Sequence, residues 1–500
     1  MNFRPSDPDR VLHDTWVFLA DEDIHLFYLA PQVGNSNHRL IGHAVSNDWL
    51  HWRELPYIEL TGAPGSWDAG RVGTGHVFKH DDGRYYMAYT GRVDPREEIG
   101  LAVSDDLITW HKPLDEPVLP QRREPPYEHS LPEHGNQPAW RDPFVIRTPD
   151  GTLHAYFTAR VDRGASSGRG CVGRARIDAL DRWTLLEPIA ATGDYAVMEV
   201  PEIFEFEGRW WLTFNTGSGW GCRLDTQSRR LISGTFCLSA EEIEEPWTAP
   251  RNNLLIGSGE GRRDAIVARS VEYQGERLVY HHYDGDLTAA SPRALGLPKV
   301  LACSGDGLAL RPWPGISRIW REEISLAEPQ PLTAQPWARA TWDIAPPRIL
   351  GQCAESVAAC RAELPGPDLD LELDIQIDRG ERAGITLGAG DGSARGVCIL
   401  LDNLRNELSI GYMRPVTYGI ILDATMDRCL REIRTDVKYS LRIIKRDRYV
   451  EVFVERELLF SLVVETSEEG RSWLGMLLDR CNARFHLRRV TSLEPIGDTS

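Results

Sequence analysis

Apolar and polar residues alternate in short runs along the first 300 residues, and turns rich in Gly, Asp and Pro separate the runs. Alternation of this kind is typical of β-strands. Five segments share one pattern, an apolar strand, a tight turn and a second strand rich in aromatic residues: 14–30, 75–91, 142–160, 200–217 and 264–285. Gly in the turns supplies the positive φ that a tight hairpin requires. The pattern therefore predicts five β-hairpins.

A second unit recurs between these hairpins. Residues 41–52 read IGHAVSNDWLHW and residues 99–110 read IGLAVSDDLITW, so that seven of twelve positions are identical. The same skeleton of a strand, a polar turn and a closing Trp survives in 172–183 and 234–247. Four short strands repeated five times are typical of a β-propeller. We therefore predict an all-β chain whose residues 1–320 form a five-bladed propeller.

The repeat ends after residue 316, and the rest of the chain has a different organisation. Residues 321–352 are rich in Pro and have no clear period, which predicts a linker or strap. Residues 353–500 return to plain alternation without a fivefold repeat, which favours a C-terminal β-sandwich. We expect this sandwich either to brace the propeller or to form an oligomer contact, and the sequence does not distinguish the two.

Charge and composition restrict the partners. The chain has 56 Lys and Arg against 74 Asp and Glu, a formal net charge of −18. Nucleic acids and anionic membrane surfaces both require a basic protein surface, so neither is an expected partner. The first residues lack the apolar segment of a secretory signal, and the nine Cys are scattered without a C-x-x-C pair. We expect a cytoplasmic protein with reduced thiols that binds a neutral small molecule.

Acidic residues recur where the hairpins begin. Asp14, Asp142 and Asp264 open the first, third and fifth hairpins, and Glu199 precedes the fourth. In a propeller the first strand of each blade lines the central channel, so these carboxyl groups are expected to meet there. Crowding and burial raise the pKa of at least one of them. One protonated and one ionised carboxyl group are what cleavage of an acetal requires. The alternative is that the acids only cap hairpins.

Five stretches together resemble glycoside hydrolase family 32, the invertases, inulinases and levanases. They occur in the family's order along nearly the whole chain, at 41–56, 140–151 (WRDPFVIRTPDG), 198–215 (MEVPEIFEFEGRWWLTFN), 293–301 and 440–454. The resemblance implies a retaining hydrolase that needs no cofactor. It implies a carbohydrate substrate, from which terminal β-fructofuranosyl units are released, such as a sucrose-like sugar or a fructo-oligosaccharide.

Carried over position by position, the resemblance implies roles for individual residues. Asp14 would be the nucleophile, Glu199 the general acid and base, and Asp142 the residue that binds sugar hydroxyls. Arg141 would orient these acids. Glu202 is the rival acid, but residues 199 and 202 face opposite sides of an extended strand, and the motif favours Glu199.

The remaining candidates for substrate binding are polar or aromatic residues near the expected inner strands. They are His13, Trp16, Trp67, Asp68, Thr74 and His76, with Trp140 and Trp220 as further rings that could stack on a sugar. Of His281 and His282, we expect at least one to be a core histidine and not an ion ligand. No cluster of residues has the spacing of a metal site, so neither a metal nor a cofactor is expected.

The sequence departs from the family in its first blade. In place of an Asn-Asp-Pro-Asn box it has LHDTWVF at 12–18, which is closer to the pattern of family 68, the levansucrases and inulosucrases. Family 68 lacks the C-terminal domain, so family 32 is favoured, but the sugar and the acceptor stay open. A fructosyltransferase, an inverting arabinofuranosidase or xylosidase of the family 43 type, and a non-catalytic carbohydrate-binding propeller are the alternatives.

Overall fold

The computed structural model describes residues 3–121, 125–128, 139–217, 232–259, 262–284, 293–331, 340–389, 396–416, 419–465 and 472–495. Within these ranges the regular structure consists of strands, apart from short 3₁₀ helices at Ser166–Gly168 and Pro314–Ile319. The chain divides into two compact units, Met1–Ala309 with Asp498–Ser500 and Leu310–Gly497. No helix among the described residues is both long and apolar enough to cross a membrane.

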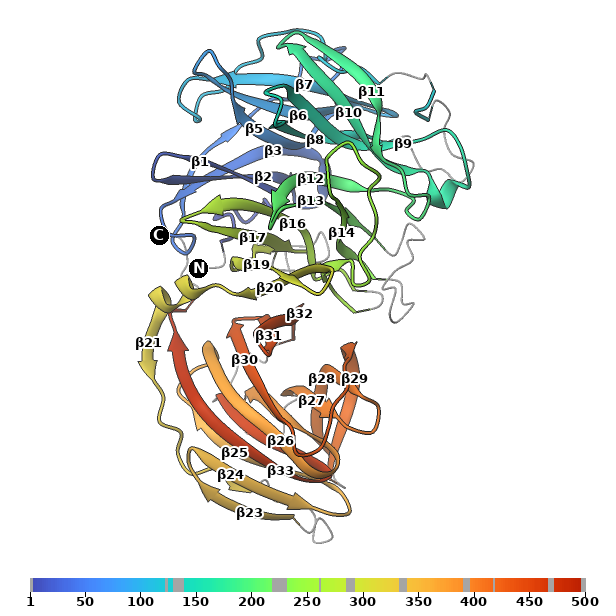
Figure 1. Cartoon of the computed structure of the whole chain (residues 1–500). Coiled ribbons are helices and arrows are strands. Elements are labelled where there is room, and N and C mark those ends of the chain that lie inside the picture. Colours follow the sequence, from blue (N-terminus) through green and yellow to red (C-terminus); the bar gives the residue numbers. More distant parts are fainter. Residues whose placement is uncertain are drawn as a thin grey trace. The chain divides into compact units, whose positions relative to one another are not determined.

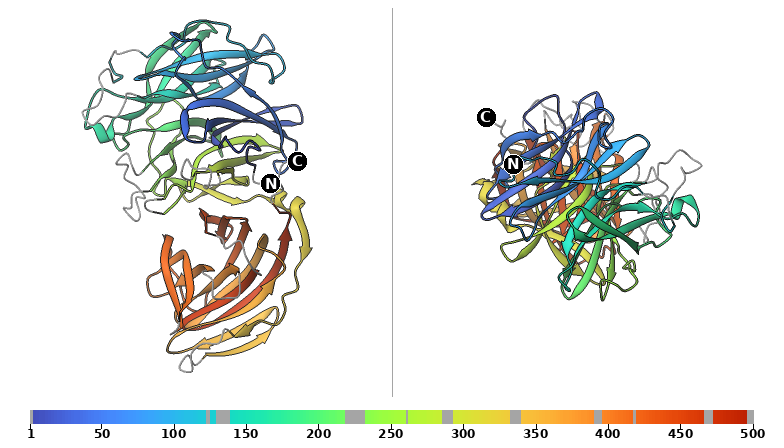
Figure 2. Two further views of the ribbon diagram at one scale, coloured as in Figure 1. Left: turned by 180° about the vertical axis from the view of Figure 1, so that it is seen from behind. Right: turned by 90° about the horizontal axis from the view of Figure 1, so that it is seen from above.

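The first unit is a five-bladed propeller (Figures 1 and 2). Each blade is an antiparallel sheet whose strands follow one another in chain order, and the first strands contact their neighbours around the ring, with β1 against β16. The all-β class and the five blades predicted from the repeats are therefore confirmed. The strands are β1 (His13–Ala20), β2 (Asp23–Gln32), β3 (Asn35–Ser46), β4 (Arg53–Ile58); β5 (Arg71–Lys79), β6 (Tyr85–Val93), β7 (Arg96–Ser104); β8 (Trp140–Arg147), β9 (Leu153–Arg160), β10 (Gly170–Ala179), β11 (Arg182–Ala190); β12 (Glu199–Phe206), β13 (Arg209–Thr216), β14 (Gly234–Ala240), β15 (Leu254–Gly257); β16 (Ala265–Tyr273), β17 (Glu276–Tyr283), β18 (Ala294–Leu295), β19 (Lys299–Ser304) and β20 (Gly307–Pro312).

One irregularity is repeated in the first strand of every blade. The pairing register shifts near the start of β1, β5, β8, β12 and β16. In four of these strands a residue other than Gly takes a positive φ at the shift: Asp14 (30°), Asp142 (57°), Val200 (48°) and Val267 (53°). A bulge of this kind bends the strand and re-aims its side chains. The repeated bulge therefore positions the residues at the channel end of each blade.

The second unit contains one continuous sheet of thirteen strands. It occupies the region for which the sequence predicted a β-sandwich. Two long strands, β26 and β33, pair with each other along most of their length and join both halves of the sheet. The segment expected as a linker, 321–352, contributes strands to this sheet. The strands are β21 (Trp320–Glu323), β22 (Gln330–Pro331), β23 (Ala340–Ala345), β24 (Arg348–Cys353), β25 (Val357–Leu364), β26 (Leu369–Ala389), β27 (Gly396–Asp402), β28 (Glu407–Val416), β29 (Gly419–Leu430), β30 (Lys438–Arg446), β31 (Tyr449–Val454), β32 (Glu457–Val463) and β33 (Ser472–Leu493).

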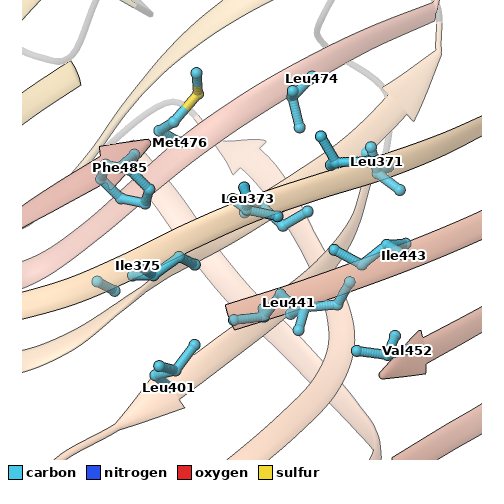
Figure 3. Packing of buried hydrophobic residues seen from close by; sticks show 14 of the residues in the cluster. Leu371, Leu373, Ile375, Leu401, Leu441, Ile443, Val452, Leu474, Met476 and Phe485 are labelled. Carbon is cyan, nitrogen blue, oxygen red and sulfur yellow. The ribbon is translucent and has the colours of Figure 1, made fainter. Parts of the chain in front are cut away.

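Alternating apolar residues of these strands fill one core (Figure 3). Leu371, Leu373 and Ile375 of β26 occupy every second position and are fully buried, together with Leu441 of β30 and Met476 of β33. Burial of each such side chain stabilises the fold by about 1.5–3 kcal/mol. The strict alternation of LDLELDIQI therefore places its apolar side chains in this core and points its Asp and Glu side chains away from it.

Candidate active site

A cavity of about 440 Å³ lies where the first strands of the blades meet. Asp14 of β1, Asp142 of β8 and Glu199 of β12 all line it, as does Thr74 of β5. Three acids from three blades therefore converge on one cavity. Asp264, which opens the fifth hairpin, does not line it. Its carboxylate is nearly buried and accepts a hydrogen bond from Arg262.

Asp14 is held in its ionised form. Thr74 Oγ1 donates a hydrogen bond to Oδ2 at 2.6 Å, and His13 Nδ1 lies 3.0 Å from Oδ1. Burial by itself acts to raise the pKa of Asp14, but His13, the nearby His282 ring and the Thr74 hydrogen bond outweigh it and hold that pKa well below its usual range. A carboxylate in this state is a nucleophile at any moderately acidic or neutral pH.

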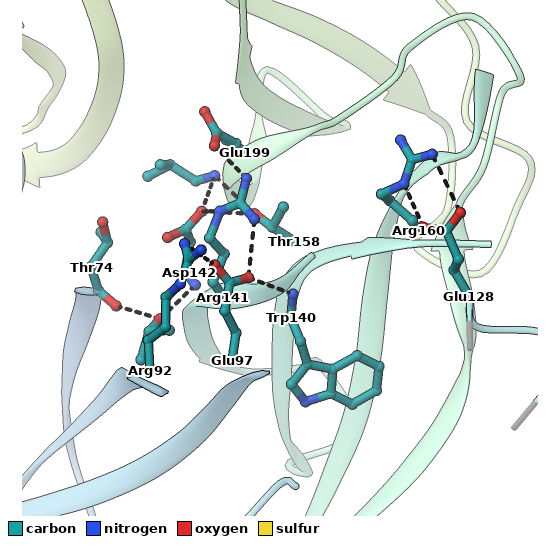
Figure 4. Close-up of polar contacts among 12 residues, drawn as sticks. Thr74, Arg92, Glu97, Glu128, Trp140, Arg141, Asp142, Thr158, Arg160 and Glu199 are labelled. Carbon is teal, nitrogen blue, oxygen red and sulfur yellow. Dashed lines mark hydrogen bonds and ion pairs between the residues drawn. The ribbon is translucent and has the colours of Figure 1, made fainter. Parts of the chain in front are cut away.

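Arg141 connects the other acids (Figure 4). Its Nη2 pairs with Glu199 Oε1, its Nε lies 3.5 Å from Asp142 Oδ2, and its Nη1 lies 3.1 Å from Glu97 Oε2. Glu97 is nearly fully buried and also accepts a hydrogen bond from the backbone N–H of Trp140 at 3.0 Å. Charge-assisted bonds of this kind fix the orientation of the groups that they join. Arg141 therefore sets the position of Glu199 relative to Asp142.

Asp142 and Glu199 differ from Asp14 in their ionisation. Asp142 accepts hydrogen bonds from Thr158 Oγ1 at 2.9 Å and from the N–H of Val200 at 3.2 Å. Burial raises the pKa of Asp142 to about 6 and that of Glu199 to about 7, although Arg141 opposes both shifts. The cavity therefore holds an ionised carboxylate and a carboxyl group that keeps its proton near neutral pH, which is the pairing that acid–base cleavage of an acetal uses.

The propeller matches a known protein family. Residues 14–254 match the family model described as glycosyl hydrolases family 32 N-terminal domain. The N-terminal domain belongs to glycoside hydrolase family 32. Beta-fructofuranosidase 1 of Zea mays is 34% identical over 145 residues, which are 27% of this chain and 20% of that protein. Sucrose:sucrose 1-fructosyltransferase of Festuca arundinacea is 34% identical over 103 residues, 19% of this chain and 15% of that protein. The chain thus matches a fifth or less of the length of these relatives.

Solved structures share the fold of the family 32 domain and of the second unit. Fructan 1-exohydrolase IIa from Cichorium intybus has a TM-score of 0.69 and 14% identity, with 99% of this chain and 97% of that chain covered. Exo-inulinase from Aspergillus awamori also has a TM-score of 0.69, with 16% identity and coverage of 99% and 98%. At this identity the likeness concerns the fold alone.

Several residues that the sequence suggested for substrate binding lie outside the cavity of the family 32 domain. Asp68 is fully buried, where it accepts hydrogen bonds from Tyr89 Oη and Lys112 Nζ, both at 2.8 Å. The indole of Trp67 packs against Tyr89. Both residues therefore stabilise the second blade, and their predicted contact with the sugar is corrected.

His76 and Glu202 also point away from the cavity. His76 Nδ1 accepts a hydrogen bond from the N–H of Val145 at 3.2 Å, and Glu202 accepts hydrogen bonds from Ser270 N and Oγ at 2.8 and 2.6 Å. Both come after the bulge in their strands, where the side chains face the neighbouring blade. Their assignment as substrate-binding residues is corrected for this reason. By contrast, His13, Thr74 and Arg141 line the cavity.

Trp16 is a core residue. Its side chain is fully buried and stacks on Phe27 with a ring distance of 6.1 Å. Trp140 is likewise buried, against Tyr127 and Phe157. Neither ring is available to stack on a sugar, so the candidate role of Trp16 is corrected. Trp220 lies outside the described residues.

We expect Trp16→Ala to lower the free energy of unfolding by about 3–5 kcal/mol, because it removes a buried aromatic ring and leaves a cavity. Urea unfolding followed by Trp fluorescence measures this change. Val93→Ala, at a residue 40% exposed on the same domain, provides a control that should change stability little. An unaltered unfolding midpoint in Trp16→Ala, together with a raised KM, would reinstate Trp16 as a sugar contact.

The sequence did not reveal seven further polar residues that line the cavity. They are Arg39, Arg71, Thr90, Arg92, Glu97, Asn215 and Arg263. Arg92 and Glu97 flank a turn, RVDPRE, whose charges are normally read as a solvated hairpin end. Arg71 and Arg92 lie directly opposite each other on β5 and β6. This pairing depends on strand register, so no sequence motif could show it.

The fold also assembles a group of metal-type donors that the sequence spacing concealed. Donor atoms of His13, Asp14 and His282 all lie within 4.8 Å of one another. His282 is fully buried, and within the described ranges neither of its ring nitrogens has a hydrogen-bond partner. Two imidazoles and a carboxylate are ligands that Zn²⁺ accepts. The three residues are not spaced like metal ligands in the sequence, so the sequence offered no sign of this group, and the expectation that no metal is bound stays a prediction.

Proposed function

We propose that the chain is a retaining glycoside hydrolase of the β-fructofuranosidase type. The observation that carries this proposal is the convergence of Asp14, Asp142 and Glu199 on one cavity, in which the pKa of Asp14 is lowered and burial raises that of Glu199 to about 7. The family of the N-terminal domain and the names of its curated relatives support a fructosyl group as the unit transferred. The substrate class is a small carbohydrate with a terminal β-fructofuranosyl unit.

The residues perform two successive steps in this proposal. Asp14 attacks the anomeric carbon while Glu199 gives its proton to the departing glycosidic oxygen, so that a covalent fructosyl ester forms. Glu199, now ionised, removes a proton from water, and that water displaces Asp14 and restores the starting state. Asp142 accepts hydrogen bonds from sugar hydroxyls, which strengthen as the ring flattens in the transition state. Arg141 holds Glu199 and Asp142 in position.

Product analysis tests the reaction. Incubation with sucrose and with 1-kestose, followed by chromatography and ¹H NMR at early times, should show release of fructose with retained anomeric configuration. Initial inversion, or turnover of arabinofuranosides or xylosides alone, would overturn the proposal in favour of the family 43 alternative. Longer fructosyl products in place of fructose would show a transferase, and no turnover of any glycoside would leave a binding propeller.

The pH dependence of kcat/KM follows from the ionisation of the acids. Glu199 must be protonated in the first step and its pKa is about 7, so activity should fall as the pH rises through that value. Asp14 must be ionised and its pKa is lowered, so the acidic limb should lie well below pH 4. Because Asp142 is close to Glu199, the two carboxyl groups titrate together, and the alkaline limb reports the apparent pKa of the pair and not of Glu199 alone.

Arg141→Gln should move the alkaline limb to higher pH, because the guanidinium of Arg141 lowers the pKa of both Glu199 and Asp142. Initial rates over pH 3–9 for the two proteins measure the shift. Arg147→Gln, an exposed residue of the same strand β8 that pairs with Asp81, is the matched control and should leave the limb in place. An alkaline limb that moves to lower pH in Arg141→Gln would contradict the assignment.

A further inference from the structure

Three arginines gather on one side of the cavity. Arg39 of β3, Arg71 of β5 and Arg92 of β6 all line it. Arg71 and Arg92 occupy directly opposite positions on neighbouring antiparallel strands. Like charges at such positions destabilise a sheet. In a chain with a net charge of −18, this concentration of positive charge requires an explanation.

The carboxylates of the site do not neutralise all three arginines. Arg92 pairs with Glu97 at 3.1 Å and with Asp94, whose side chain is 60% exposed. Arg71 lies 3.8 Å from the same Asp94 and donates a hydrogen bond to the neutral side chain of Asn37. Arg39 donates from Nε to the carbonyl of Ser36 at 2.7 Å and, among the described residues, has no carboxylate within ion-pair distance.

The arginines also act on one another. Burial, followed by the proximity of Arg71, lowers the pKa of Arg39, and burial followed by Arg92 lowers the pKa of Arg71. Each guanidinium therefore has a positive neighbour, at an energetic cost that an anion would remove. Guanidinium groups bind carboxylate and phosphate oxygens through two parallel hydrogen bonds. Within the described part of the chain, the hydrogen bond of Arg39 uses Nε and leaves its terminal nitrogens for an anion.

We propose that Arg39 and Arg71 form an anion subsite next to the catalytic acids, and that the substrate is a fructoside with a phosphate or carboxylate group. The fructosyl unit of this substrate rests on the proposed function, and its anionic group rests on the arginines. It replaces the neutral ligand expected from net charge, because the local field of the cavity differs in sign from that of the whole chain. A competing explanation is that Arg39 only stabilises ionised Asp14.

Substrate selectivity tests the subsite. We would measure kcat/KM for sucrose, sucrose 6-phosphate and the fructoside of glucuronic acid, which separate phosphate from carboxylate recognition. The wild-type protein should prefer one of the two anionic substrates to sucrose by at least about tenfold, which corresponds to about 1.4 kcal/mol. In the double variant Arg39→Gln/Arg71→Gln this ratio should fall to about one, whereas Arg39→Lys should retain part of it.

Arg84→Gln is the control, because Arg84 is exposed in the β5–β6 turn, pairs with Asp82 and does not line the cavity. Its selectivity ratio should equal that of the wild type. Sucrose as the preferred substrate of the wild type, or an unchanged ratio in the double variant, would overturn the subsite. A loss of activity towards all three substrates in equal proportion, with a displaced acidic limb, would show instead that the arginines act through Asp14.

Direct binding separates this inference from the proposed function. Isothermal titration of the full chain with inorganic phosphate should show binding to the wild type and to Arg84→Gln, and none to Arg39→Gln/Arg71→Gln with an unchanged thermal unfolding midpoint. Phosphate binding without cleavage of any fructoside would support the anion subsite and refute the hydrolase. Sucrose cleavage without phosphate binding or anionic preference would do the reverse.

Discussion

Asp14→Asn should lower kcat for fructoside hydrolysis by about 10⁴-fold or more, because an amide cannot form the covalent ester that splits the reaction into two steps. The exchange keeps the shape of the side chain, so the hydrogen bond from Thr74 is retained and the bulge at residue 14 is preserved. Initial rates at saturating substrate, together with the thermal unfolding midpoint, measure the two effects separately.

Asp81→Asn is the control for this variant. Asp81 has a side chain 77% exposed in the β5–β6 turn, far along the strand from the cavity, and pairs with Arg147. Its rate should equal that of the wild type. Mass spectrometry of the wild-type protein quenched during turnover should add the mass of one fructosyl unit to the peptide that contains Asp14. Activity of Asp14→Asn near the wild-type level would remove Asp14 as the nucleophile.

Glu199→Gln should lower kcat for sucrose by about 10²–10⁴-fold, because the departing oxygen then receives no proton. The loss should be much smaller for a fructoside with an activated leaving group such as nitrophenol, which departs without protonation. The alkaline limb of the pH profile should change as well, since one of the two coupled groups that set it has been replaced. These three readouts distinguish a lost acid from a damaged fold.

Glu202→Gln provides the matched control on the same strand. Its carboxylate accepts hydrogen bonds from Ser270, lies 3.9 Å from Arg277 Nη1 and is not part of the cavity. The exchange should therefore reduce thermal stability while kcat and the leaving-group dependence stay close to those of the wild type. If Glu202→Gln instead lost activity towards sucrose alone and Glu199→Gln did not, the two glutamates would exchange roles.

The propeller could be predicted because its repeats are local. Each hairpin shows alternation of apolar and polar residues around a tight turn within about twenty residues, and four of the five turns contain Gly. Five copies of this pattern favour a propeller over other all-β folds. The convergence of residues 14, 142 and 199 follows from their places near the start of equivalent strands, with Glu199 one residue before the position that Asp14 and Asp142 occupy. The first blade illustrates this, since Asp14 could be placed on the channel although the motif around it departs from the family.

The positions of the other candidates depended on the bulges, which the sequence does not announce. An additional residue in a strand reverses which side chains face the channel beyond it. This is why His76 and Glu202, a few residues past the shift, contact neighbouring blades and not the cavity. The same applies to Arg71, whose position opposite Arg92 depends on the register between β5 and β6. Residues brought together by the packing of two blades, such as His13 of β1 and His282 of β17, leave no local pattern either.

The bulge shared by the first strands affects which substitutions the cavity can accept. Val267 faces the cavity from the fifth blade with the same left-handed backbone that Asp14 and Asp142 have in theirs. A β-branched residue is strained in that conformation, whereas Asn and Asp tolerate it. Val267→Asn would therefore relieve this backbone strain and add a further polar side chain to the cavity. The fifth blade thus provides a position, already in the required backbone conformation, at which a polar side chain could adapt the cavity to a different sugar.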